Sequence, residues 1–360
     1  MADAAGPQAP APLAARLHAR GDIRLGAASR PVPGPGQLLL RVTAVGICGS
    51  DLHWYEEGGT GEVRLHEPLV LGHEFAAVIE EGPRAGERVA VDPADPCEAC
   101  DLCRSGRGRL CASMRFAGLD PFDGALQTYL AWPESRCVPI PPELPDHLVP
   151  LLEVTGIALH AADLAGLVPG TTAGVYGAGP IGLVLIRVLR ALGVERIVAT
   201  DRRPHRVSAA LASGATEAHL VTGDVDPAAS IPVDVAFECA GDDGALATAI
   251  RAVRPGGRVL LVGIPSGDRS AFPASPARRK ELTLQLVRRM EALDLARAVA
   301  LVQAGVISLE GLVTDRFPFA EVVAAFAAAS ARDGLKVVVE LPGTPTLTPA
   351  RPSLTPGTPS

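Results

Sequence analysis

The chain has 360 residues, 48% of them hydrophobic, which is too long for one small module and indicates at least two domains. Its net charge of −7 excludes the strongly basic surface typical of nucleic-acid-binding proteins. No apolar run reaches the roughly 18 residues of a membrane-spanning helix. Residues 1–12 lack the basic start and apolar stretch of a signal peptide. We therefore expect a cytoplasmic protein without membrane or nucleic-acid partners.

The two ends of the chain differ in composition from its middle. Residues 1–22 are rich in Ala and Pro and are expected to form a loose N-terminus, and the tail 342–360 is expected to be disordered. Residues 23–150 contain short apolar segments broken by Gly and Pro, a pattern typical of a β-rich domain. Strands are expected there at 37–45, 68–71, 76–80 and 88–91.

From residue 151 to about 289, strand-like and helix-like segments alternate, which predicts a parallel sheet with helices on both faces. Strands are expected at 173–176, 196–200, 218–221, 233–238, 258–262 and 282–287, and helices at 180–192, 204–212 and 244–253. Two more strand-like segments, 312–317 and 336–341, flank a helix at 320–331, so residues 290–341 are expected to complete the first domain. The predicted fold class is α/β.

A glycine-rich turn joins the first expected strand and helix of the second domain. Gly177, Gly179 and Gly182 match G-x-G-x-x-G, in which glycines allow a tight turn, a close pyrophosphate and close helix–sheet packing. The following helix N-terminus offers free N–H groups to phosphates. An ordinary glycine-rich turn is the alternative, but the strand before and the helix after indicate a dinucleotide site, with Pro180 and Ile181 as further contacts.

An acidic residue follows this motif at the end of the next strand. Asp201, nineteen residues after Gly182, can accept hydrogen bonds from ribose hydroxyls and would repel a 2′-phosphate. This favours NAD over NADP, although Arg202 and Arg203 can accommodate such a phosphate. Arg202 and Arg206 are included among the expected cofactor-binding residues.

Four of the seven cysteines fall within fifteen residues. Cys97, Cys100, Cys103 and Cys111 offer four thiolates on one loop, and in a reducing compartment such clusters hold metal more often than they form disulfides. Four sulfur ligands complete tetrahedral zinc without an open position, which predicts a structural zinc site. Free thiols and an iron–sulfur cluster are the alternatives.

A second set of candidate ligands is spread along the chain. Cys48, His73, Glu74 and Glu153 offer a thiolate, an imidazole and carboxylates, which can hold zinc with one position open for substrate. An open zinc lowers the pKa of a bound alcohol, so that its proton leaves before the hydride does. Each residue also has an ordinary interpretation; Cys48, for example, can be a small buried hydrophobe.

Polar residues near Cys48 are candidates for proton transfer. Ser50 and His53 are placed to relay a proton to solvent, and Asp51 is a candidate acceptor for the second ring nitrogen of His73. A surface position is the alternative for His53.

Several of these motifs, taken together, resemble the zinc-dependent medium-chain dehydrogenases, and within that family the polyol branch of sorbitol, xylitol and L-idonate dehydrogenases. The segments that carry the resemblance are GICGSDLHWYEEG at 46–58, EPLVLGHEFAAVI at 67–79, the four-cysteine loop, LLEVTGIALHA at 151–161 and VYGAGPIGLVLI at 175–186. The resemblance implies a GroES-like β-rich catalytic domain, a doubly wound Rossmann domain, and a homodimer or homotetramer.

The resemblance also implies roles for individual residues. It implies a catalytic zinc on Cys48, His73, Glu74 and Glu153, a relay through Ser50 and His53, a structural zinc on Cys97, Cys100, Cys103 and Cys111, and NAD on Gly177, Gly179, Gly182 and Asp201. Glu153 is followed by Val154 where polyol enzymes commonly have Pro. Arg288 is the expected match to the family's basic substrate contact, and its aromatic partner is missing. Further pocket candidates are Trp54, Tyr55 and Phe116, with Arg64 and Arg115 as cations.

The sequence therefore predicts an NAD-linked zinc dehydrogenase that oxidises a secondary alcohol of a polyol or sugar acid to a ketone. Threonine dehydrogenase and cyclitol or aminocyclitol dehydrogenase are the alternatives within the family. The alternative that is not an enzyme is a nicotinamide-binding sensor or a crystallin-like relative without turnover. The full set of zinc ligands argues against it.

Overall fold

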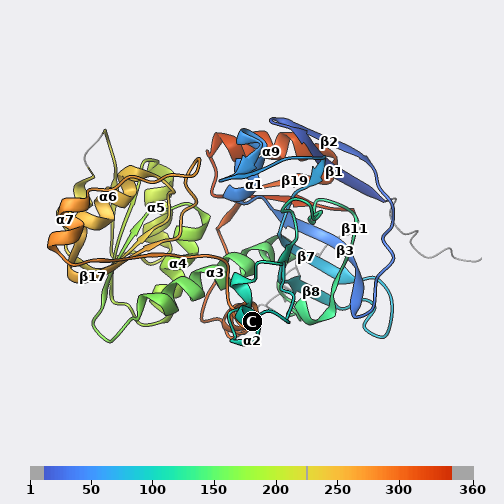
Figure 1. Ribbon diagram of the computed structural model, residues 1–360, viewed down its shortest axis with the longest axis horizontal. Coiled ribbons are helices and arrows are strands. Elements are labelled where there is room, and N and C mark those ends of the chain that lie inside the picture. Colours follow the sequence, from blue (N-terminus) through green and yellow to red (C-terminus); the bar gives the residue numbers. More distant parts are fainter. Residues whose placement is uncertain (1–11, 224–225, 343–360) are drawn as a thin grey trace, which may run out of the picture.

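The structure of the chain is a computed structural model that describes residues 12–223 and 226–342. It contains two large β-sheets with a long helix, α3 (Pro150–Ala165), in contact with strands of both (Figure 1). In Figure 1, the sheet built mainly from the N-terminal part lies to the right and the sheet of the middle part lies to the left.

The first large sheet has the strand order β12-β8-β7-β3-β20-β19, and β11 pairs with β3 at one end. Its strands are β3 (Gln37–Gly46), β7 (Glu74–Ile79), β8 (Arg88–Val91), β11 (Tyr129–Pro133), β12 (Cys137–Pro139), β19 (Val313–Pro318) and β20 (Lys336–Glu340). Because β20 pairs antiparallel with β3, the end of the chain returns to the sheet that the N-terminal part began. The five strands expected in these regions are confirmed, with ends that shift by a few residues.

The loose N-terminus expected for residues 1–22 is wrong from residue 13 onward. β1 (Leu13–Ala19) and β2 (Asp22–Ala27) form a hairpin, and β1 also pairs with β6 (Leu69–Val70). The small side chains of Ala14 and Ala15 are fully buried, which lets β1 pack closely against the rest of the domain. Residues 1–11 and the tail 343–360 lie outside the described residues.

The second large sheet is entirely parallel and has the order β15-β14-β13-β16-β17-β18. Its strands are β13 (Thr172–Tyr176), β14 (Arg196–Asp201), β15 (Glu217–Leu220), β16 (Val233–Glu238), β17 (Val253–Leu261) and β18 (Thr283–Leu286). Numbered in chain order this is 3-2-1-4-5-6, the order of a doubly wound dinucleotide-binding sheet. The order reverses between β13 and β16, and ligands of such sheets bind at the carboxyl ends of the strands at that point.

Helices connect these parallel strands as the sequence predicts. α4 (Pro180–Ala191), α5 (Pro204–Ala212) and α6 (Asp243–Ala252) lie within a residue of the expected ranges, and α7 (Ala274–Arg279) precedes β18. α8 (Asp294–Gln303) packs against α3, and α9 (Val322–Ala331) packs against β19 and β20. The chain therefore rejoins the first sheet at β19.

The helix α3 is apolar over most of its surface because it is a core helix. Among the described residues, the stretch Asp146–Ala165 is long and apolar enough to cross a membrane by length and composition, but 83% of that window is buried inside the protein. Leu151, Leu152, Ala158 and Leu159 are fully buried in the largest hydrophobic core. Burial against other elements of the fold accounts for this composition.

Candidate metal centres and dinucleotide site

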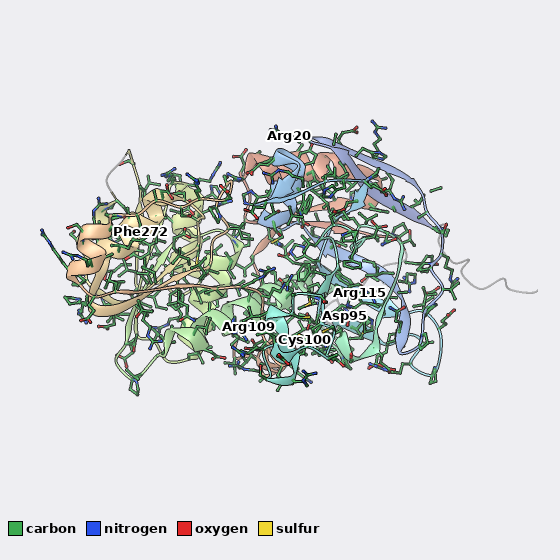
Figure 2. The ribbon with its side chains drawn as sticks, viewed as in Figure 1. Arg20, Asp95, Cys100, Arg109, Arg115 and Phe272 are labelled. Carbon is green, nitrogen blue, oxygen red and sulfur yellow. The ribbon has the colours of Figure 1, made fainter. Side chains whose placement is uncertain are left out.

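The loop from Cys97 to Cys111, which we call the cysteine lobe, brings its four sulfurs together. It is formed by α2 (Asp101–Arg104) and a 3-10 helix at Gly108–Leu110, and Cys100 and Arg109 mark its place in Figure 2. All four Sγ atoms lie within 4.8 Å of one another. Three of the Sγ–Sγ distances are 3.5 Å (Cys100–Cys103), 3.9 Å (Cys97–Cys103) and 3.9 Å (Cys100–Cys111).

These distances fit a metal and do not fit a disulfide. Sulfurs about 2.3 Å from a tetrahedral zinc lie roughly 3.8 Å from one another, whereas a disulfide needs about 2.05 Å. The backbone N–H groups of Ala99 and Cys100 donate to Cys97 and lower the pKa of its thiol to about 6, so a thiolate is favoured there. The cysteine lobe therefore has the donor set and the spacing of a closed zinc site.

A second group of potential ligands forms where the first sheet meets α1 (Gly49–Glu57). The ligand atoms of Cys48, His73 and Glu74 lie within 4.8 Å of one another, although these residues come from two segments more than twenty residues apart. Cys48 precedes α1 as its N-cap, and His73 and Glu74 stand at the start of β7. His73 and Glu74 are buried, and Cys48 is half-buried.

Asp51 contacts this group through both the backbone and His73. Its carboxylate accepts hydrogen bonds from the backbone N–H of Cys48 (2.9 Å) and of Gly72 (3.2 Å) and lies 3.4 Å from His73 Nδ1. Burial opposes ionisation of Asp51, but the charge and hydrogen bond of His73 outweigh it and lower the pKa of the carboxyl. A carboxylate on one ring nitrogen leaves the other, Nε2, free to bind a metal.

The electrostatics of this group fit a cation. Burial lowers the pKa of His73, yet the charges of Asp51 and Cys48 raise it well above its usual range, so a proton on the imidazole balances them. A zinc ion on the same thiolate, imidazole and carboxylate donors would supply that positive charge.

Glu153 lies near this group but outside its 4.8 Å cluster. It is 7% exposed in the first turn of α3, and burial raises the pKa of its carboxyl to about 8. His73 and Glu74 both affect that pKa, His73 lowering it and Glu74 raising it. The structure thus brings together three of the four predicted catalytic ligands and places the fourth beside them.

Lys336 is a residue at this centre that the sequence analysis missed. Its side chain is 1% exposed, its Nζ donates to the carbonyl of Ile47 (2.9 Å), and it forms an ion pair with Glu74. Burial lowers the pKa of Lys336, but the charges of Glu74 and Cys48 outweigh this effect and raise it. The only sequence signal was a lysine at the head of an apolar strand.

The two proposed relay residues lie on α1. Ser50 Oγ lies 3.3 Å from His73 Nε2. His53 stands one turn further along the helix, with Nδ1 2.9 Å from Glu57 Oε1 and Nε2 3.3 Å from the carbonyl oxygen of Ile264 in the second domain. Its side chain is only 13% exposed, so the surface interpretation of His53 does not describe it.

Of the aromatic pocket candidates, Phe116 lies at the site. Its ring centroid is 5.5 Å from that of His73. Trp54 is buried in the core of the first domain, and Tyr55 packs against Phe326 with centroids 5.1 Å apart.

The cation beside this aromatic is Arg289, whereas Arg288 was expected to match the family's basic substrate contact. Arg288 is exposed, whereas the half-buried guanidinium of Arg289 lies 5.0 Å from the Phe116 centroid. Burial lowers the pKa of Arg289 to about 10, and the charge of Arg288 adds to this. A left-handed backbone at Arg289 (φ 58°) redirects the chain after β18. The other two cations are engaged elsewhere: Arg64 with the carbonyl of Gly61, and Arg115 with Phe122, Trp132 and Asp95.

The glycine-rich turn after β13 has the backbone that its motif predicts. Gly177 has φ 105°, which favours glycine. A Cβ there would also lie 2.7 Å from the backbone nitrogen of Ala240, two residues after the end of β16. A Cβ on Gly182 would clash with the carbonyl oxygen of Gly177. A Cβ on Gly179 would meet only the guanidinium of Arg206, at 3.6 Å, so this side of the turn is open to a phosphate.

The remaining predicted cofactor residues surround this turn. Asp201 ends β14 and accepts hydrogen bonds from the backbone N–H of Ala178 (2.9 Å) and Arg203 (2.9 Å). Pro180 and Ile181 form the half-buried first turn of α4. Arg206 is half-buried beside the turn, and Arg202 is exposed, 3.7 Å from Asp242.

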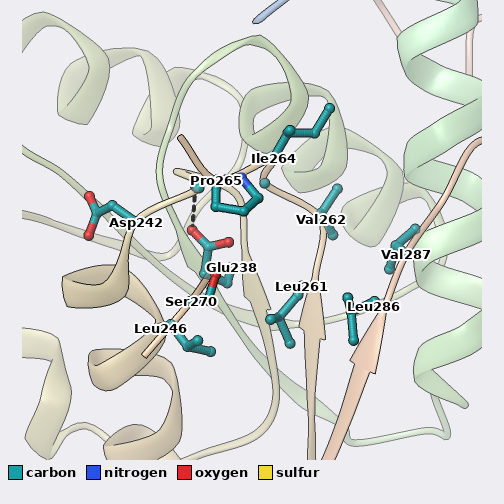
Figure 3. Close-up of a pocket in the computed structure, with 12 residues that line it drawn as sticks. Glu238, Asp242, Leu246, Leu261, Val262, Ile264, Pro265, Ser270, Leu286 and Val287 are labelled. Atoms are coloured by element: carbon teal, nitrogen blue, oxygen red, sulfur yellow. Dashed lines mark hydrogen bonds between the residues drawn. The ribbon is translucent and has the colours of Figure 1, made fainter. Parts of the chain in front are cut away.

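A pocket of about 180 Å³ opens at the carboxyl ends of β16, β17 and β18 (Figure 3). Glu238 and Gly241 line it, together with the segment from Val262 to Pro265 after β17 and Leu286 at the end of β18. Glu238 Oε1 accepts hydrogen bonds from the N–H groups of Ala240 and Gly241, both at 2.7 Å. Burial raises the pKa of Glu238 to about 7, although these N–H groups lower it. The sequence analysis did not single out Glu238, which sits at the last position of a confirmed strand.

Comparison with known proteins agrees with this arrangement. The family model "Alcohol dehydrogenase GroES-like domain" matches residues 34–142, and "Zinc-binding dehydrogenase" matches residues 180–304. Probable D-xylulose reductase A of Aspergillus terreus is 34% identical over 333 residues, which cover 86% of this chain and 93% of the relative.

Two solved structures are similar over nearly their whole length. L-Idonate 5-dehydrogenase from Escherichia coli has a TM-score of 0.85 and 27% identity, covering 91% of this chain and 98% of that one. A putative zinc-binding dehydrogenase from Sinorhizobium meliloti, bound to NADP, has a TM-score of 0.81 and 28% identity, covering 92% and 99%. Sequence, fold and donor groups agree, and the chain belongs to the zinc-dependent medium-chain dehydrogenases, in their polyol branch, as an oxidoreductase that acts on CH–OH groups.

Proposed function

We propose that this protein oxidises a secondary alcohol of a polyol or sugar acid to the ketone, with NAD as the hydride acceptor. The observation that carries the proposal is the Cys48, His73 and Glu74 cluster, with the Ser50 hydroxyl 3.3 Å from His73 Nε2. These three residues would hold the catalytic zinc, with Glu153 as the fourth group beside them. When bound, zinc supplies Lewis-acid polarisation of the substrate oxygen, and NAD accepts the hydride.

The chain's own residues then handle the proton. Ser50 accepts it from the substrate hydroxyl, and His53 receives it at the boundary between the two domains and releases it to water. Asp51 keeps the His73 ring oriented, and Lys336 holds Glu74 through their ion pair. The cysteine lobe would hold the second, structural zinc, because four sulfurs leave no position for substrate.

We assign the cofactor to the switch point between β13 and β16. The free N–H groups at the start of α4 and the open side of Gly179 suit the pyrophosphate, with Pro180, Ile181 and Arg206 around it. The buried carboxylate of Asp201 supports NAD, because a 2′-phosphate would meet its negative charge. Arg202 is exposed, and its guanidinium lies 3.7 Å from Asp242. If NADP binds, Arg202 is the residue that would meet its 2′-phosphate.

The substrate class follows from the pair of Arg289 and Phe116 next to His73. A guanidinium offers five N–H donors to hydroxyl or carboxylate oxygens. L-Idonate 5-dehydrogenase is the structurally similar protein whose named substrate carries both groups. We therefore propose that an oxygen-rich chain, a polyol or an aldonate, lies along Phe116 with its far end on Arg289.

We also propose that the protein forms a homo-oligomer and is located in the cytoplasm. β18 is the edge strand of the second sheet, and its last residue, Leu286, is 77% exposed; a second copy that pairs with this edge strand would cover it. Light scattering of the wild type and Leu286→Arg tests the dimer, since the variant is expected to halve the mass. None of the seven cysteines forms a disulfide, which supports a reducing compartment.

We also propose a division into two domains. One comprises residues 23–150 completed by 290–341, and the other comprises residues 151–289. The return of β20 to β3 supports the shared first domain.

The experiment is a substrate panel with metal removal. Reduced nicotinamide is followed by absorbance with xylitol, sorbitol, L-idonate, L-threonine and an inosamine, with NAD or NADP, before and after chelation. We expect turnover of a polyol or aldonate that disappears with the metal and returns with zinc, and a zinc content near two per chain. Turnover that survives complete metal removal would refute the mechanism, and turnover of L-threonine or the inosamine alone would refute the substrate class.

A further inference from the structure

A carboxylate on the relay helix contacts His53 from outside the metal-binding group. Glu57 lies one helical turn after His53, and its Oε1 is 2.9 Å from His53 Nδ1. The other ring nitrogen, Nε2, is 3.3 Å from the carbonyl oxygen of Ile264. Both partners can accept a hydrogen bond, so each ring nitrogen of His53 faces an acceptor.

Glu57 also contacts the second domain. The hydrogen bond from His53, and then those from the Ser266 hydroxyl and the Gly267 N–H, lower the pKa of Glu57, so its carboxylate form is favoured. Ile264 lines the pocket at the ends of β16 to β18 (Figure 3). The side chains of His53 and Glu57 therefore join the relay helix to the loop 264–267 beside the assigned cofactor site.

No other charged side chain on the elements packed against α1 is paired with His53 in the described part of the chain. Arg332, at the end of α9, lies 3.6 Å from Glu56, and Arg20 donates to the backbone carbonyl of Glu56. The strand β4 (Gly59–Thr60) has no charged residue. Glu56 and Glu57 are thus adjacent carboxylates on one helix, of which only Glu57 contacts His53.

We propose that Glu57 is a positioning residue for His53, which makes that histidine the terminal proton acceptor of the dehydrogenase and ties its protonation to the loop 264–267. This rests on the proposed function. Glu57 accepts the Nδ1–H, which leaves Nε2 as the nitrogen that takes the proton. The new Nε2–H then donates to the Ile264 carbonyl.

The proton balance follows from the oxidation. Conversion of CH–OH to C=O removes one hydride, which carries two electrons to the nicotinamide cofactor, and one proton, which Ser50 passes toward His53. The imidazolium is stabilised by the negative charge of Glu57 until it releases the proton to water. The loop 264–267 is therefore expected to be held most firmly when His53 carries the transferred proton.

The test is Glu57→Gln in the zinc-loaded full chain. Gln keeps the size of Glu57 but removes the charge that stabilises the imidazolium, so the neutral base persists to more acidic pH. In single-turnover formation of NADH, we expect the acid limb of the pH–rate profile to move about 0.5–1 pH unit lower. The plateau rate is expected to fall several-fold, because a weaker base accepts the proton more slowly.

Glu56→Gln is the matched control, because it removes one carboxylate from the same helix without contact to His53; we expect a wild-type profile. In a His53→Gln background, Glu57→Gln is expected to produce no further shift. If Glu57 affects only folding, Glu57→Gln will lower the rate equally in the wild-type and His53→Gln backgrounds and will not move the pH–rate profile. That result would overturn the proposal.

A second measurement does not depend on turnover. In protein labelled with ¹⁵N-histidine, the His53 signals, identified by their loss in His53→Gln, are followed against pH. In Glu57→Gln the transition to the charged ring is expected at lower pH than in the wild type and in Glu56→Gln. An unchanged transition would refute the role of Glu57, whereas absence of turnover with a shifted transition would refute the proposed function and leave this pairing standing.

Discussion

Replacement of Lys336 by Met tests how the catalytic group is held together. The ammonium of Lys336 is buried against Glu74 and donates to the carbonyl of Ile47, and its side chain is 1% exposed. Met has a similar length and fills the same space without the charge. The change therefore removes one partner of a buried ion pair and leaves the Glu74 carboxylate, itself 1% exposed, without its cation.

The magnitude follows from this burial. Removing one partner of a buried ion pair costs roughly 3–5 kcal/mol, because the remaining charge loses its compensation. For a chain of this size that corresponds to roughly 4–7 °C in melting temperature. The loss is expected to be largest in metal-free protein, because a bound zinc would itself compensate Glu74.

The assay is thermal unfolding of the metal-free and zinc-loaded forms, together with zinc content. Lys280→Met is the control, because Lys280 is the other lysine of the chain and its ammonium caps α6 by donating to three carbonyls, including those of Ile250 (3.2 Å) and Val253 (2.7 Å). We expect a loss of about 1–2 kcal/mol there, without dependence on zinc. The reasoning would be refuted by equal decreases in melting temperature in the two variants. It would also be refuted if zinc did not reduce the loss of stability in Lys336→Met.

Three further predictions concern the substrate side, the cysteine lobe and the pocket. Arg289→Met is expected to raise KM for aldonates about 10- to 100-fold, from the loss of a charged hydrogen bond, whereas Arg288→Met, an exposed control, should leave KM unchanged; steady-state kinetics decide. Cys100→Ser is expected to reduce zinc content from about two to about one per chain, measured by plasma mass spectrometry; a full count would contradict the structural site. The pKa of Glu238 in the folded protein, about 7, exceeds its ordinary value of 4.5, so the wild type loses stability as pH rises between these values. Glu238→Gln should therefore be more stable than wild type at pH 8 by at most roughly 3 kcal/mol and equal to it near pH 4.5. Melting curves at the two pH values test this, and an advantage at the lower pH would contradict it.

The parallel sheet could be predicted closely from the sequence because its signals are local. Strand β16 and helix α5 have the predicted ends, because Pro232 precedes the strand, Pro204 begins the helix and Gly214 follows shortly after its end. The turn at Gly177 follows from its motif, and the motif carries its own context of strand and helix. The four sulfurs of the cysteine lobe are also close in sequence, so their meeting follows from spacing.

The catalytic group depends on long-range packing, which local patterns do not contain. Lys336 reaches Glu74 only because β20 pairs with β3 across nearly three hundred residues of chain. Which of the two adjacent arginines is half-buried could not be predicted either, because the left-handed backbone at Arg289 has no signal in the local sequence pattern. The hairpin of β1 and β2 was missed because an Ala-rich segment has weak strand propensity and gains its stability from burial.

The cysteine lobe connects to the reaction centre through one arginine. Arg109, on the lobe, forms an ion pair with Glu291, and its backbone carbonyl accepts a hydrogen bond of 3.1 Å from Arg289. Arg289 in turn lies over Phe116, which contacts His73. A lobe that loses its metal loses the constraint on Arg109 and hence on Arg289, the cation that we propose contacts the substrate. The same Cys100→Ser variant should therefore raise KM for the substrate while KM for NAD stays unchanged, because the glycine-rich turn at Gly177 belongs to the other sheet. A rise in both would show that the lobe supports the whole fold and not the substrate side in particular.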